Sequence, residues 1–179
     1  GGDLTLSHIT VDGGAVWSGE LNSATPAGRT NTGLAASAPL IKVDGSMALR
    51  GGTALQNNDR SSSGGGVYVA GTLTMTGGEI SNNRAYGDTA GVNGGGVYVT
   101  TSGTFSMNSG SISDNHAANY GGGIHITGRG AFTMTGGDIS GNMAMSGLSN
   151  TGRGGGVGLA GGIFTLTDGN ILNNYATLY

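Results

Sequence analysis

A glycine triplet followed by alternating apolar residues returns four times in this chain, at intervals of about 30 residues. The copies begin at Gly64, Gly94, Gly121 and Gly154. A period of this size is typical of stacked supersecondary units, each of which is too small to bury its own apolar face. The repeat therefore predicts a solenoid in which neighbouring units share one continuous core.

Each repeat contains the same short segments in the same order. The triplet and its strand are followed by a segment such as Leu73–Thr76, a glycine corner such as Gly77–Gly78, and a segment such as Ile80–Ala85. These segments alternate apolar and polar residues, as half-buried strands do, and no window has the 3.6-residue apolar period of a helix. The predicted fold class is all-β: a parallel β-helix solenoid with three short strands per coil and about five to six coils.

Equivalent positions of the repeats carry similar residues, which predicts that they stack inside the solenoid. Three columns are apolar: Val67, Val97, Ile124 and Val157; Met75, Met107, Met134 and Leu166; and Ile80, Ile112, Ile139 and Ile171. A structural ladder of asparagines is expected at Asn58, Asn83, Asn115, Asn142 and Asn174. We expect these asparagines to adopt the left-handed conformation and to bond the coils on either side.

The whole chain, residues 1–179, is interpreted as a single β-helix domain. Residues 1–38 read as a partial N-terminal coil, with Asp12 at the asparagine position, followed by an excursion loop over 15–38 that contains Trp17. Residues 39–63 read as a degenerate coil, and the clear coils are 64–93, 94–120, 121–153 and 154–179. Because the chain starts and stops within a repeat, we interpret it as a piece of a longer protein whose open ends could associate end to end.

Composition argues against several classes of function. The chain has no cysteine, so a disulfide framework and thiolate metal sites are excluded. Charged residues make up 9% of the chain and its net charge is −3, so no basic face for nucleic acid is expected. No apolar run is long enough to span a membrane. His8, His116 and His125 share no metal-ligand spacing, and neither a metal nor a cofactor is expected.

Outward positions decide function in a β-helix, because side chains fill the inside. The column Lys42, Tyr68, Tyr98 and His125 supplies the candidate ligand-binding residues. Two tyrosines on adjacent rungs are suited to stacking on sugars or to holding a protein partner. The alternative is an aromatic pair that only stabilises the sheet, by about 0.2–1 kcal/mol.

Two other outward columns suggest weaker alternatives. Threonine pairs such as Thr74 and Thr76 resemble the ice-binding faces of some β-helical antifreeze proteins. Ala48, Arg50 and Asn108 interrupt the array, and threonine is favoured on any half-exposed strand. Glu79 and Asp138 would lie two rungs apart, near the upper limit of the carboxylate spacing of inverting glycosidases. No basic cluster accompanies them, so no catalytic residue and no enzyme activity is expected. The variable column that includes Arg84 and His116 is expected to be exposed.

The segment Ile80–Ala85, followed by a variable loop and then Gly94–Tyr98, resembles the repeats of polymorphic outer-membrane proteins. Residues 39–179 share this layout, and the wider resemblance is to pectin-lyase-like β-helices of bacterial surface proteins, including glycine-rich adhesins. The resemblance implies a right-handed parallel β-helix at the bacterial cell surface or outside the cell. It implies adhesin-like binding of a glycan or a host or matrix protein, with a purely structural stalk or fibre module as the alternative.

Overall fold

The computed structural model describes residues 2–13, 38–87, 91–146 and 153–178. These residues form an all-β structure and contain no helix. The predicted excursion at 15–38, apart from residue 38, lies outside the described residues. Parts of the loops before Gly94 and Gly154 also lie outside them.

The strands of the N-terminal half are β1 (Asp3–Leu6), β2 (Thr10–Asp12), β3 (Ile41–Val43), β4 (Ser46–Leu49), β5 (Ala54–Gln56), β6 (Asp59–Arg60), β7 (Val67–Val69), β8 (Thr72–Ser81) and β9 (Arg84–Ala85). Those of the C-terminal half are β10 (Val97–Val99), β11 (Thr104–Ser113), β12 (His116–Ala117), β13 (Ile124–Ser140), β14 (Met143–Ser146), β15 (Val157–Leu172) and β16 (Tyr175–Leu178). Most are short, as expected for glycine-punctuated repeats.

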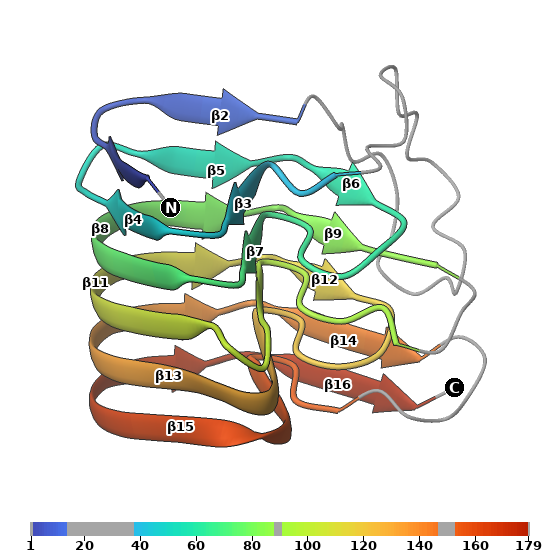
Figure 1. Ribbon diagram of the computed structural model, residues 1–179. Coiled ribbons are helices and arrows are strands. Elements are labelled where there is room, and N and C mark those ends of the chain that lie inside the picture. Colours follow the sequence, from blue (N-terminus) through green and yellow to red (C-terminus); the bar gives the residue numbers. More distant parts are fainter. Residues whose placement is uncertain (1, 14–37, 88–90, 147–152, 179) are drawn as a thin grey trace.

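Every pairing between these strands is parallel and joins equivalent segments of consecutive repeats. Figure 1 shows the repeats stacked in layers, which we call rungs. One line of strands runs β1-β4-β8-β11-β13-β15 and another runs β6-β9-β12-β14-β16. The pairs Val67↔Val97, Met75↔Met107 and Ile80↔Ile112 confirm the predicted register.

The longest strands differ from the prediction of three separate short strands in each repeat. β8 and β11 continue through the glycine corner, and β13 and β15 include the preceding strand as well. The corner glycines bend the chain without ending its pairing. Gly78 has a φ of 84°, and a Cβ atom there would lie 2.8 Å from the carbonyl oxygen of Thr53. Glycine is therefore needed for both the backbone conformation and the close approach of the rung before it.

The core is the stack of inward apolar side chains, and it is completely buried in the middle rungs. The residues Phe105 and Phe132 are fully buried, and their ring centroids lie 4.8 Å apart. Phe132 also stacks on Phe164 at 5.0 Å. At the two ends the inward positions are uncovered, so Leu4 and Leu166 are both 48% exposed. Each repeat thus buries its neighbour's apolar side chains.

A continuous line of amide hydrogen bonds connects the five ladder asparagines. Between consecutive rungs, Asn83 Nδ2 donates to Asn115 Oδ1 at 3.1 Å, and Asn115 Nδ2 donates to Asn142 Oδ1 at 3.0 Å. Each of these side-chain oxygens also accepts a bond from the backbone N–H of the preceding asparagine, at 3.0 Å in both cases. Asn142 continues the line to Asn174, and Asn58 N–H begins it by donating to Asn83 Oδ1.

Two local predictions about this corner are wrong. The left-handed conformation occurs one residue earlier than predicted, at Asn57, Asn82, Asp114, Gly141 and Asn173. Asp12 does not occupy the asparagine position, because it pairs with Gln56. It accepts hydrogen bonds from the side chains of Gln56 and Asn57 instead. The left-handed residue turns the chain, so the next asparagine points along the stack.

Candidate functional site

Four aromatic side chains and an arginine form a stack on the outer side of β7, β10 and β13. We call Arg60, Tyr68, Tyr98, His125 and Tyr120 the aromatic column. The ring centroids of Tyr68 and Tyr98 lie 5.3 Å apart, and those of Tyr98 and His125 lie 5.5 Å apart. Tyr120 stacks on His125 at 5.8 Å, and the Arg60 guanidinium lies 6.0 Å from the Tyr68 ring centre. The structure thus brings three of the four predicted ligand-binding residues together.

The stacking determines which parts of the rings are free. The rings lie within about 25° of parallel, so neighbours in the column cover their faces. Tyr68 and Tyr98 are half-buried, and what they expose is their edges. Burial raises the pKa of Tyr98, while a hydrogen bond with the Thr127 side chain opposes this shift. The column therefore offers a partner ring edges and phenol oxygens rather than open ring faces.

His125 is not the exposed ligand-binding residue that the sequence predicted. Its residue surface is only 2% exposed, and both Tyr98 and Tyr120 stack on its ring. Burial lowers the pKa of His125 to about 4. Its Nδ1 atom has no hydrogen-bond partner in the described part of the chain. His125 is thus a neutral packing residue near pH 7.

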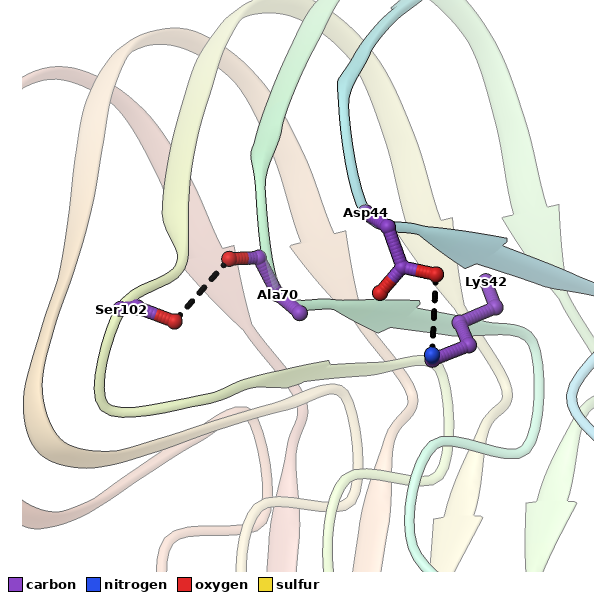
Figure 2. A network of polar contacts seen from close by, with 4 residues as sticks. All are labelled: Lys42, Asp44, Ala70 and Ser102. Carbon is purple, nitrogen blue, oxygen red and sulfur yellow. Dashed lines mark hydrogen bonds and ion pairs between the residues drawn. The ribbon is translucent and has the colours of Figure 1, made fainter. Parts of the chain in front are cut away.

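Lys42, the fourth predicted residue, is exposed in β3 and lies in register with Tyr68. Figure 2 shows its Nζ atom directed at Asp44, and the distance to Asp44 Oδ2 is 2.9 Å. In the neighbouring corner Ser102 Oγ donates to the carbonyl oxygen of Ala70 at 3.1 Å. An exposed ion pair of this kind contributes about 0–1 kcal/mol, so Lys42 can exchange Asp44 for another acceptor at little cost.

A second group of polar residues was missed in the sequence. Asp59, Arg84 and His116 lie in register on β6, β9 and β12, and all three are buried. The prediction that Arg84 and His116 are exposed is therefore wrong. The Arg84 Nη1 atom lies 3.7 Å from Asp59 Oδ2, and the Arg84 guanidinium stacks over Tyr86 at 4.7 Å. Burial lowers the pKa of Arg84, whereas Asp59 and then Tyr86 raise it. In the sequence, this pairing could have been found from Asp59 and Arg84, which carry opposite charges at equivalent positions of adjacent repeats.

The two carboxylates of the outward column Glu79, Ser111 and Asp138 lie on separate rungs. Glu79, Ser111 and Asp138 are in register on β8, β11 and β13, so two rungs separate the carboxylates. Asn170 Nδ2 donates to Asp138 Oδ1 at 2.9 Å, and both side chains are exposed. The charge of Glu79 also affects Asp114. The pKa of Asp114 is raised mainly by burial and, to a smaller extent, by the negative charge of Glu79. No group of three histidine, aspartate or glutamate side chains able to hold a metal occurs among the residues that the structure describes.

The predicted threonine column is only partly regular. Thr74, Ser106, Thr133 and Thr165 lie opposite one another on β8, β11, β13 and β15. The next outward positions lose this register, because irregularities follow Met107 in β11 and Met134 in β13. Thr76 and Thr167 bond backbone carbonyls there, both at 3.4 Å. The ordered part of the column therefore ends at the second outward position.

Comparisons with protein families, with curated proteins and with solved structures found no match for this chain. In the part of the chain that the structure describes, no helix is long and apolar enough to cross a membrane.

Proposed function

We propose that this chain is a right-handed parallel β-helix segment of a bacterial surface protein, outside the cell, and that it binds a glycan or an extracellular protein. The parallel register of consecutive repeats and the layered stack of Figure 1 support the β-helix. The likeness of the Ile80–Ala85 segment to repeats of polymorphic outer-membrane proteins supports the location. The exposed edge of the aromatic column is the proposed contact.

One observation carries the binding proposal. Tyr68 and Tyr98 present half-exposed edges side by side, and the exposed Lys42 lies in register with Tyr68 on the neighbouring strand β3. Tyrosine edges combine an apolar ring with a hydroxyl that donates and accepts hydrogen bonds, and they lose little entropy when held. Because the ring faces are covered, a sugar would be bound through hydrogen bonds to hydroxyls and not by stacking.

A structural spacer is the second candidate, and a different observation favours it. The buried asparagines bond their own copies in the neighbouring rungs, so the interior is organised around stacking alone. In this alternative the aromatic column is one more stabilising ladder without a ligand. We do not propose enzyme activity, because no basic cluster in the sequence accompanies Glu79 and Asp138, and Asn170 bonds the latter.

The two candidates separate in a binding experiment on glycan and extracellular-matrix protein arrays. The wild-type chain is compared with a Tyr68→Phe/Tyr98→Phe variant, which keeps the stack but loses both hydroxyls, and with Tyr68→Ala/Tyr98→Ala. Binding that falls at least tenfold in both variants, with the fold intact by circular dichroism, supports recognition by the tyrosine edges. Binding that is unchanged in the Ala variant, or absent from the wild type, contradicts it and favours the spacer.

A further inference from the structure

A second outward surface carries a regular array of seven hydroxyl side chains, two alanines and one exposed isoleucine. It consists of two columns on β4, β8, β11, β13 and β15, which we call the hydroxyl face. The first column contains Ser46, Thr72, Thr104, Ala131 and Ile163, and the second contains Ala48, Thr74, Ser106, Thr133 and Thr165. All ten residues are exposed or half-exposed, and none is charged.

The array repeats in two directions. Neighbouring rungs are separated by ~4.8 Å, and alternate residues along a strand by ~6.7 Å, so the two columns form a rectangular net of side chains. The parallel register of β8, β11, β13 and β15 is unbroken over these positions. Figure 1 shows these strands following one another along one side of the stack.

The side chains of the net are held firmly. Residues between the two columns point inward, and Leu73, Phe105 and Phe132 are fully buried there. Threonine is branched at Cβ, and its χ1 angle is restricted on a strand. The net therefore keeps its spacing without a partner, and a rigid partner does not have to order it first.

The hydroxyl groups of the second column are unoccupied. Thr74, Ser106, Thr133 and Thr165 have no hydrogen-bond partner among the residues that the structure describes. Thr76 and Thr167, just outside the net, bond backbone carbonyls instead. The hydroxyls of the net are therefore free to bond water.

The chemistry of the face argues against the usual macromolecular partners. It has no aromatic or arginine anchor of the kind that dominates protein interfaces, and no aromatic platform on which a sugar could stack. It has no lysine or arginine for phosphate groups. A partner without side chains or charges, which repeats its hydrogen-bonding groups in two directions, fits this face better.

We propose that the hydroxyl face binds ice. The threonine methyl groups would fit between the ordered waters of an ice surface, while the hydroxyls replace hydrogen bonds of the lattice. The absence of charge matters because ammonium and carboxylate groups are strongly hydrated and orient water around themselves. This activity is separate from partner binding at the aromatic column and does not depend on it.

Ice growth in the presence of the purified chain tests the proposal. In a nanolitre osmometer the wild type is expected to facet ice crystals and to depress their growth temperature below the melting point. Thr133→Tyr, at the centre of the net, should reduce the gap between the melting temperature and the growth temperature at least fivefold. Ser62→Tyr places the same bulk at an exposed hydroxyl before β7 and should leave the gap unchanged.

Two outcomes would overturn the proposal. One is round, freely growing crystals with the wild type at millimolar concentration. The other is a gap that Thr133→Tyr leaves intact. Because that variant could fold poorly, Thr104→Lys serves as a second test: it puts a charge at an exposed position of the net and should abolish faceting. Circular dichroism melting of both variants confirms that the stack is intact.

Discussion

Two columns of side chains lie next to each other along the same corner of the stack, and they are built in different ways. The first is the asparagine ladder, in which one residue type recurs and the side-chain amides of Asn83, Asn115 and Asn142 each donate to the asparagine of the next rung. The second consists of the residues that follow the asparagines, namely Asp59, Arg84, His116, Met143 and Tyr175. No two of these are alike.

The difference shows why some positions keep the same residue type in every repeat and others do not. A side chain that bonds a copy of itself can be used on every rung, and it holds the rungs in one register. The next residue points to the other side of the strand, so it is free to vary as long as its neighbours compensate its charge. Arg84 and Asp59 do so as a buried pair at 3.7 Å. Variation therefore concentrates on the outward side, where we place binding.

The largest expected effect comes from the ladder. Asn115→Ala removes two donor bonds of the Asn115 amide and leaves the buried N–H of Asn83 without its acceptor. We expect a loss of about 3–5 kcal/mol in the free energy of unfolding, measured in urea. Asn108→Ala, at an exposed position of β11, is the matched control and should cost under about 0.5 kcal/mol. Equal losses in the two variants would contradict the role of the ladder.

The second column should respond to the loss of one charge and tolerate the loss of both. Asp59→Leu alone leaves the buried Arg84 guanidinium without its ion pair and is expected to cost about 3 kcal/mol. Asp59→Leu combined with Arg84→Met should recover most of this loss, because apolar pairs replace buried ion pairs well. Denaturant unfolding of the single and double variants gives the coupling. A double variant no more stable than Asp59→Leu would count against the pairing.

The aromatic column predicts a smaller, pH-dependent effect. The pKa of His125 is lowered to about 4 by burial, so the unfolded chain takes up a proton at higher pH than the folded protein does. The contribution of His125 to the free energy of unfolding is fully present above the unfolded pKa of ~6.5 and is lost as the pH falls toward 4. Between pH 7 and pH 5 the loss should be about 2 kcal/mol. His125→Phe should remove this part of the pH dependence; an unaltered profile would show that His125 titrates normally.

The smallest effect separates stacking from hydroxyl chemistry. Tyr68→Phe keeps the contact with Tyr98 and should change the free energy of unfolding by less than about 0.5 kcal/mol. Tyr68→Ala loses the stack and should cost about 1 kcal/mol. Thermal melting followed by circular dichroism measures both, and a larger cost for the Phe variant would mean that the hydroxyl is structural.

The sequence was most informative where the repeats are most alike. The inward columns and the ladder positions could be predicted because four copies agreed at each position. The left-handed position lies one residue before the ladder asparagine, and the residues there are all types that tolerate it: Asn57, Asn82, Asp114, Gly141 and Asn173. That second pattern lay directly beside the ladder.

The outward side was harder to predict, since its burial depends on contacts that alternation does not encode. His125 alternates as an exposed residue should, but Tyr120, the last residue of the preceding repeat, stacks on its ring. Alternation does not assign Thr72 and Thr104 to the threonine array, because they lie at the starts of their strands. Pairing across rungs was needed to see them as one column.

Hydrogen–deuterium exchange resolved to single amides tests most directly whether the ladder holds the repeats together. The backbone N–H groups of Asn83 and Asn115 donate to the next asparagine, at 3.0 Å in both cases. They should exchange only with global unfolding, while amides of β2 and β16 at the two ends exchange at least a hundredfold faster. Ladder amides that exchange as fast as those of the end strands would contradict the account.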